Sequence, residues 1–184
     1  IFDGITDDCI REYLTINMSE KHADLLKVKE RNGNGKLKFN SVELFDNLNN
    51  LISEGFSGDF LKIRIGFNVY QKIFFDKLIL AIGIRDAYEN DVVSYVTDEM
   101  GIRFSPIDLE KGYFIIEIPQ LMLRGGRYYL RLLAMENDTN PENFLDELNS
   151  IVSFNVIGSD YWNSGKTMRN SESCFMDGTI SLEV

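Results

Sequence analysis

Few side chains in this sequence could carry out catalysis, and they do not form a complete set. A serine or cysteine nucleophile needs a histidine base, and the one histidine, His22, lies in a polar stretch before the predicted strands begin. Glu117 and Asp86 remain open as a glycosidase-type carboxylate pair, because both lie on or beside predicted strands. The Gly165-Lys-Thr triplet could end a phosphate-binding loop, but Asp160 stands where that loop needs a glycine. We therefore expect a protein that is not an enzyme.

Acidic residues gather after the longest predicted hairpin, but their spacing does not suit a metal ion. The group consists of Glu136, Asp138, Glu142, Asp146 and Glu147. An EF-hand places its ligands at fixed positions in a twelve-residue loop, and this group does not follow that pattern. We interpret residues 136–149 as a solvated acidic loop with a helical turn after Pro141, and we expect neither a metal ion nor a cofactor.

Polar and aromatic side chains on one face of a predicted sheet form a more coherent set. In residues 127–135, Leu130 and Leu132 have the spacing of a core face, which directs Tyr129 and Arg131 outwards. The same alternation on two further predicted strands gives six outward residues: Gly83, Arg85, Tyr129, Arg131, Ser153 and Asn155.

Small residues in the middle of these six would leave a shallow hollow. A tyrosine ring can contact the C–H face of a sugar, and planar arginine and asparagine groups can bind its hydroxyls. The set therefore predicts a glycan-binding surface, with an ordinary solvated sheet face as the alternative.

Residues 112–134 have the pattern of two strands joined by a tight turn, which such a surface requires. Residues 113–118 are β-branched and aromatic, and Pro119 ends the run because proline cannot donate into a ladder. Gly125 and Gly126 supply the backbone freedom of a turn. A tyrosine just after such a corner is typical of the tyrosine corner of β-sandwiches.

Alternating runs elsewhere bring the total to eight or nine short strands without a long helical pattern. They lie at residues 36–45, 60–70, 78–85, 92–97, 151–157 and 179–184. This arrangement predicts an all-β fold, an immunoglobulin-like antiparallel β-sandwich. We expect a short N-terminal helix over residues 5–14 and a linker over residues 15–35.

Composition limits the partners. The chain has 184 residues and a formal net charge of -10, which argues against nucleic acid or an anionic membrane surface as a binding partner.

Two cysteines, Cys9 and Cys174, make no disulfide framework and favour a cytoplasmic protein with reduced thiols. No apolar run reaches the length of a membrane span, so we expect no direct insertion into the membrane. The chain opens Ile-Phe-Asp without an initiator methionine, and we expect it to be a fragment of a longer protein.

The order of several segments resembles the C-terminal domain of Wzt proteins, the nucleotide-binding subunits of ABC transporters that export O-antigen polysaccharide. The resemblance covers roughly residues 33–157. The segments that carry it are Gly33-Asn-Gly-Lys-Leu-Lys-Phe-Asn-Ser-Val-Glu-Leu, Phe60-Leu-Lys-Ile-Arg-Ile-Gly-Phe-Asn-Val, Leu80-Ala-Ile-Gly-Ile-Arg-Asp, Ile118-Pro-Gln-Leu-Met-Leu-Arg-Gly-Gly-Arg-Tyr-Tyr-Leu and Phe154-Asn-Val. The opening segment Phe2-Asp-Gly-Ile-Thr-Asp-Asp-Cys-Ile-Arg-Glu-Tyr is similar to the end of the family's ATPase domain. Residues 1–32 would then be the end of that ATPase domain and a linker, and residues 33–184 a glycan-binding domain.

The resemblance implies a non-catalytic carbohydrate-binding module of the exporter, which recognises the lipid-linked O-antigen chain, often at its modified non-reducing end. It also implies a cytoplasmic location at the inner membrane, where the ATPase domain would contact the transmembrane subunit. The ATPase motifs are absent from this chain. A sandwich that only dimerises the transporter or docks a protein is the alternative, and a glycan-active enzyme is a third.

The last residues carry an expectation about assembly. Residues 159–178 are polar and look like a long arm with little to bury. Ile180, Leu182 and Val184 then alternate as in a strand. Because an arm of this kind can place its strand on its own sheet or on a partner's, and the resemblance implies exchange, we expect a homodimer with an exchanged C-terminal strand.

Overall fold

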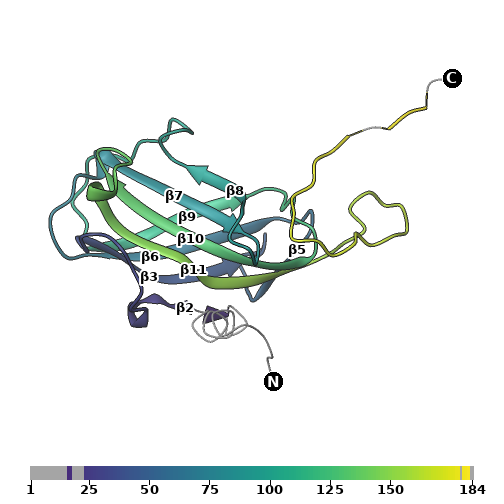
Figure 1. Cartoon of the computed structure of the whole chain (residues 1–184), viewed down its shortest axis with the longest axis horizontal. Coiled ribbons are helices and arrows are strands. Elements are labelled where there is room, and N and C mark those ends of the chain that lie inside the picture. Colours follow the sequence, from purple (N-terminus) through teal and green to yellow (C-terminus); the bar gives the residue numbers. More distant parts are fainter. Residues whose placement is uncertain (1–15, 18–22, 179, 183–184) are drawn as a thin grey trace.

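The computed structural model describes residues 16–17, 23–178 and 180–182, and these form a β-sandwich with almost no helix (Figure 1). The strands are β1 (Ile16–Asn17), β2 (Ala23–Asp24), β3 (Leu37–Phe45), β4 (Leu51–Ile52), β5 (Glu54–Phe56), β6 (Leu61–Val69), β7 (Leu78–Arg85), β8 (Asp91–Val96), β9 (Lys111–Ile118), β10 (Gly126–Glu136) and β11 (Phe144–Ile157). Single 3-10 turns are η2 (Leu25–Lys27), η3 (Phe75–Lys77) and η4 (Pro141–Asn143). The predicted helix over residues 5–14 lies outside the described residues.

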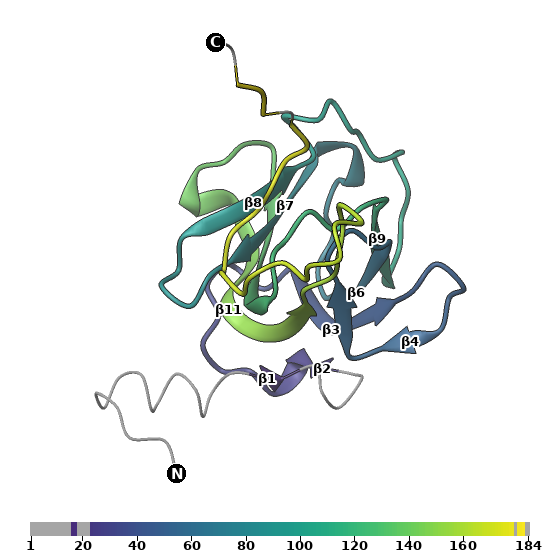
Figure 2. The same ribbon diagram turned by 90° about the vertical axis from the view of Figure 1, so that its right-hand side faces the viewer.

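The strands form two sheets that face each other (Figure 2). Sheet A has the order β1-β11-β10-β7-β8, with β5 also pairing with β11. Sheet B has the order β2-β3-β6-β9, with β4 also pairing with β3. The all-β sandwich is therefore confirmed. The strictly antiparallel expectation is wrong at one edge, because β1 and β5 run parallel to β11.

The core lies between the sheets and follows the predicted alternation. On β6, Leu61, Ile63 and Ile65 are buried against sheet A, as expected from their spacing. On β10 the core residues are Tyr128, Leu130, Leu132 and Ala134. These positions fix the other set of β10 side chains on the outer face of sheet A.

Tyr128 lies near the start of β10, beside a corner that it stabilises with its hydroxyl group. The hydroxyl donates to the carbonyl of Arg124, 2.8 Å away, and lies 3.3 and 3.2 Å from the carbonyl oxygens of Ser171 and Ser173. Burial raises the pKa of this phenol to about 12, so it keeps its proton. The predicted tyrosine therefore makes the backbone bond of such a corner.

Residues 158–178 differ from the predicted arm. They cross one end of the sandwich, where Met168 and Phe175 are buried (Figure 2). The amide of Phe175 donates to the carbonyl of Met122, and Ser171 N donates to Gly125 O. The rings of Tyr161, Trp162 and Phe175 also pack together, with centroids 4.9 to 5.5 Å apart. Because the segment is mostly polar, its few buried apolar residues were not recognised from the sequence. The expectation of an arm with little to bury is therefore wrong for this segment.

The acidic stretch after β10 also differs from expectation. The 3-10 turn after Asn140 is present, but β11 begins at Phe144, well before the predicted start at residue 151. Asp146 and Glu147 are buried rather than solvated. The local sequence looked like a loop because these acids find their partners on other elements.

Candidate functional site

The six predicted site residues lie on one face of three adjacent strands, β11, β10 and β7. Tyr129 on β10 lies opposite Arg85 on β7 and Ser153 on β11. Arg131 lies opposite Gly83, and Asn155 lies opposite Arg127. Direct cross-strand partners share a face, and Leu130 on the other face is in the core. The predicted neighbourhood and the predicted face are both confirmed.

Exposure on this face differs from the expectation. Tyr129 is only 7% exposed and Ser153 is fully buried, while Asn155 is exposed. The guanidinium of Arg127 lies 5.6 Å from the centre of the Tyr129 ring, and its NH2 atom donates to Ser153 Oγ over 3.1 Å. The expectation that Tyr129 is exposed is therefore wrong, although its register is right.

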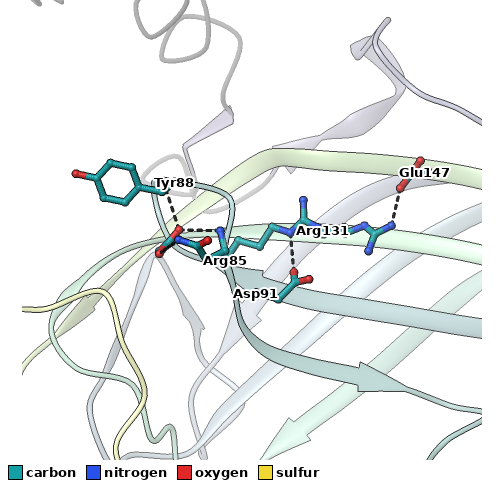
Figure 3. Close-up of polar contacts among 7 residues, drawn as sticks. Arg85, Tyr88, Asp91, Arg131 and Glu147 are labelled. Carbon is teal, nitrogen blue, oxygen red and sulfur yellow. Dashed lines mark hydrogen bonds and ion pairs between the residues drawn. The ribbon is translucent and has the colours of Figure 1, made fainter.

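Four charged residues cross sheet A and form what we call the charged strip: Asp91 on β8, Arg85 on β7, Arg131 on β10 and Glu147 on β11 (Figure 3). Arg85 Nε lies 2.6 Å from Asp91 Oδ1, and Arg131 NH2 lies 2.8 Å from Glu147 Oε1. The charges of the strip sum to zero, and its groups are planar donors and acceptors.

Gly83 lies in the middle of the charged strip and keeps it compact. A Cβ atom at this position would lie 3.2 Å from Asp91 Oδ1 and 3.4 Å from Arg131 Cβ. A side chain here would touch both neighbours, and the Asp91 carboxylate would have to move by a few tenths of an ångström. The small residue predicted in the hollow therefore fits a tightly packed place.

The Arg131–Glu147 pair is held on both sides. Burial alone would raise the pKa of Glu147, but hydrogen bonds from Arg131 and from Asn32 outweigh it and lower the pKa below its usual range. Asn32 Nδ2 donates to Glu147 Oε2 over 3.1 Å. Within the described part of the chain, Arg131 Nε is buried and has no hydrogen-bond acceptor. A donor left in this state is a candidate for a ligand or a bridging water.

Tyr88 lies at the end of the charged strip and is 84% exposed (Figure 3). The turn that presents it is closed by Asp86 Oδ1, which accepts from Tyr88 N and Asn90 N over 2.8 and 2.9 Å. Glu89 adopts a positive φ of 66° in this turn. The same Asp-x-x-x-Asn turn recurs at residues 46–50. An aspartate side chain that bonds its own backbone two residues on is typical of such turns.

Three residues of this surface were not predicted as site residues from the sequence: Tyr88, Asp91 and Glu147. The Asp-x-x-x-Asn repeat was a local signal that could have found Tyr88. No local signal marked Asp91 or Glu147, because each is paired with an arginine on a neighbouring strand. The assembled surface holds an exposed ring beside paired planar ionic groups, which is suited to binding hydroxyl groups rather than to transferring protons.

The fold is a two-sheet β-sandwich with the charged strip on the outer face of sheet A. A family model described as the Wzt C-terminal domain matches residues 28–169, and the chain belongs to this family. The solved structures that resemble it include one titled "Crystal structure of the C-terminal domain of wzt", with a TM-score of 0.61 and 14% sequence identity. That match covers 84% of this chain and 90% of the other, and it shows the fold alone.

No curated protein matches this chain. Among the described residues, no helix is long and apolar enough to cross a membrane. The family places the chain as a C-terminal domain of an ABC transporter subunit.

Proposed function

We propose that this chain is the non-catalytic carbohydrate-binding module of a polysaccharide ABC exporter. It recognises the lipid-linked O-antigen chain, at its modified non-reducing end, and presents it for export. Membership of the Wzt C-terminal domain family supports the exporter context. The charged strip beside the exposed ring of Tyr88 is the observation that supports glycan binding.

The proposed contacts keep the six residues of the sequence analysis and divide them by exposure. Arg85, Arg131 and Asn155 bind sugar hydroxyls from the outer face of sheet A. Tyr129, Ser153 and Gly83 support these groups from below, since the first two are buried and the third leaves space. The module works at the cytoplasmic face of the inner membrane, where the ATPase domain joins it to the transmembrane subunit.

Titration of the chain with O-polysaccharide purified from the strain that encodes it tests this proposal. Arg131→Gln should weaken binding at least tenfold, because it removes a charged donor from the charged strip. Lys36→Gln is a matched control, since Lys36 lies outside the charged strip and also pairs with a largely buried carboxylate, Glu136, at 3.6 Å with a similar exposure. No binding by the unmodified chain, or equal losses in the two variants, would contradict the proposal.

A second candidate is a dimerisation or docking sandwich without glycan binding. The tail, the residues after Gly178, favours an assembly role in its described part, because Ile180 is 103% and Leu182 88% exposed. The described segment 180–182 leads away from the domain (Figure 1). We propose that a homodimer covers these two side chains by placing the last strand on an edge strand of the partner. This arrangement is compatible with glycan binding on sheet A.

A further inference from the structure

A pocket with a volume of about 560 Å³ lies on the side of the sandwich away from β11. It lies beside β8 and β9, which end sheets A and B in the described part of the chain. The connection between these strands, residues 97–110, forms its outer wall together with β9. None of the charged strip lines it, so it is a separate site. Its volume is within the range of small-ligand pockets.

Aromatic rings form the floor of the pocket. Phe67 and Phe114 stack with centroids 4.5 Å apart, and Phe104 packs on Phe114 at 5.6 Å. Tyr113 and Met100 line the entrance and are more than half exposed. Exposed apolar side chains at the mouth of an apolar pocket leave it open to a ligand from solvent.

Neutral polar groups occur between these rings. Thr97 Oγ1 accepts from Leu80 N over 3.0 Å and retains its own proton to donate. Burial raises the pKa of the Tyr95 phenol, which therefore remains a neutral hydroxyl group at physiological pH. Ser105 adds a further hydroxyl group. A pure hydrocarbon would leave these groups without partners, whereas a ligand with its own hydroxyls would satisfy them.

The charge around the pocket disfavours anionic ligands. Residues 97–117 hold five acidic side chains against two basic ones, a formal net charge of -3. Lys62, which is paired with Glu117 at 3.9 Å, and Arg64, which lies 4.7 Å from the centre of the Tyr113 ring, offset part of this charge. Glu117 itself lines the pocket. A fatty acid, a phosphate or an anionic lipid headgroup would be repelled, and a neutral ligand would not.

We propose that this pocket binds a neutral 6-deoxy sugar residue, whose C6 methyl group is its apolar substituent. The substituent and the C–H face of the sugar contact Phe104, Phe114 and Tyr113, and the remaining hydroxyls meet Thr97 and Tyr95. The inference rests on the proposed function, since it assumes a glycan ligand, and it adds the chemical class of sugar that the glycan contains.

Methyl NMR spectra of the chain labelled at isoleucine and methionine test this site directly. Ile102, Ile107 and Met100 line the pocket, and their methyl signals report its occupancy even at weak affinity. The probes are methyl glycosides of 6-deoxymannose, 6-deoxygalactose and 6-deoxyglucose, each paired with the 6-hydroxy parent of the same configuration. At least one deoxy probe should shift these methyl signals saturably and bind about fivefold or more tightly than its parent.

Met100→Glu should weaken that binding about tenfold or more, because it places a charge at the apolar entrance. Met176→Glu is the matched control, since Met176 is also exposed and does not line the pocket. It should leave binding within twofold. Equal effects of the two substitutions, or pocket methyls that no probe shifts, would overturn the inference.

The other outcomes separate this inference from the proposed function. If O-polysaccharide binds and Arg131→Gln weakens it while the pocket methyls stay unchanged, the function stands and the pocket inference fails. If a deoxy probe fills the pocket but O-polysaccharide does not bind, the proposed function fails and the pocket remains a sugar site. Larger pocket shifts with decanoate, or on removal of the residues after Gly178, would identify a hydrocarbon or the tail as occupant and overturn the inference.

Discussion

Tyr88 and Tyr129 lie close to the charged strip, but their exposed fractions are 84% and 7%. A buried ring contributes to stability through its contacts, whereas an exposed ring is available to a ligand. The two tyrosines therefore have different roles on the same surface, and truncation separates them.

We predict that Tyr129→Ala lowers the free energy of unfolding by about 2–4 kcal/mol, because it opens a cavity where a ring was packed. Tyr88→Ala should change it by no more than about 0.5 kcal/mol and should weaken glycan binding. Urea denaturation and polysaccharide titration of both variants measure the two effects. Equal stability losses in the two variants would show that the burial of Tyr129 has no energetic weight.

Asp146 is a buried carboxyl group that joins β11 to sheet B. Its Oδ2 atom accepts from Phe39 N over 2.8 Å, and its Oδ1 atom lies 3.4 Å from Arg31 Nε. Burial raises its pKa from 3.8 to about 6, and the contacts with Phe39 and Arg31 offset only part of this effect. The folded state thus holds the proton more tightly than the unfolded state does.

The expected consequence is a loss of stability as pH rises. With a folded pKa above the unfolded one, the stabilisation by the proton is complete below pH 4 and disappears as pH passes through about 6. The difference corresponds to roughly 2–3 kcal/mol. Asp146→Asn should therefore show a smaller fall in urea midpoint between pH 4 and pH 7. Asp108→Asn, an exposed aspartate, controls for net charge and should retain the full fall.

At the scale of elements, the segment of residues 158–178 is attached to the sandwich through the start of β10. The Tyr128 hydroxyl lies near carbonyl oxygens of Arg124, Ser171 and Ser173, and Arg124 N donates to Ser173 O. One side chain therefore links the corner before β10 to a segment more than forty residues later.

Tyr128→Phe should loosen this attachment while leaving the core packing intact. Loss of the buried hydroxyl leaves the Arg124 carbonyl without this donor and should cost about 1–2 kcal/mol. Amide hydrogen exchange should accelerate at Phe175 and Arg124, whose amides bond across this contact. Tyr88→Phe, at an exposed site, should leave those rates unchanged. Unchanged exchange in Tyr128→Phe would mean that the apolar anchors alone hold the segment.

At the scale of the whole molecule, the two sheets present two distinct surfaces and the tail extends from the end between them (Figures 1 and 2). The charged strip lies on the outer face of sheet A, and the apolar pocket lies between the β8 and β9 edges. One glycan chain can contact both the charged strip and the apolar pocket only if the assembled protein leaves both of them accessible.

We expect the chain to form a homodimer in solution through its last strand. Truncation after Gly178 should give monomers, because it removes Ile180 and Leu182 and keeps the packed segment before them. Truncation after Ser173 would also remove the buried Phe175 and should destabilise the fold. Sedimentation velocity over a range of concentrations measures both. A full-length chain that remains monomeric at high concentration would exclude strand exchange.

Alternation of side chains was enough to predict which residues of β6 and β10 face the core. Leu61 to Ile65 and Tyr128 to Ala134 follow a period of two, and this period is a property of the backbone of an extended strand. The adjacency of β11, β10 and β7 followed from the sandwich topology that these patterns implied.

Only the tertiary structure decided how deeply each outward residue is buried and what it pairs with. Arg131 meets Glu147 across β11, Tyr129 lies beneath Arg127, and Asp146 bonds to a strand of the other sheet. Residues 144–149, expected as part of an acidic loop, belong to β11, and residues 158–178, expected as an arm, pack on the sandwich. Each of these outcomes depends on partners distant in the sequence, and the energy of a buried charge or ring is set by those partners rather than by its neighbours along the chain.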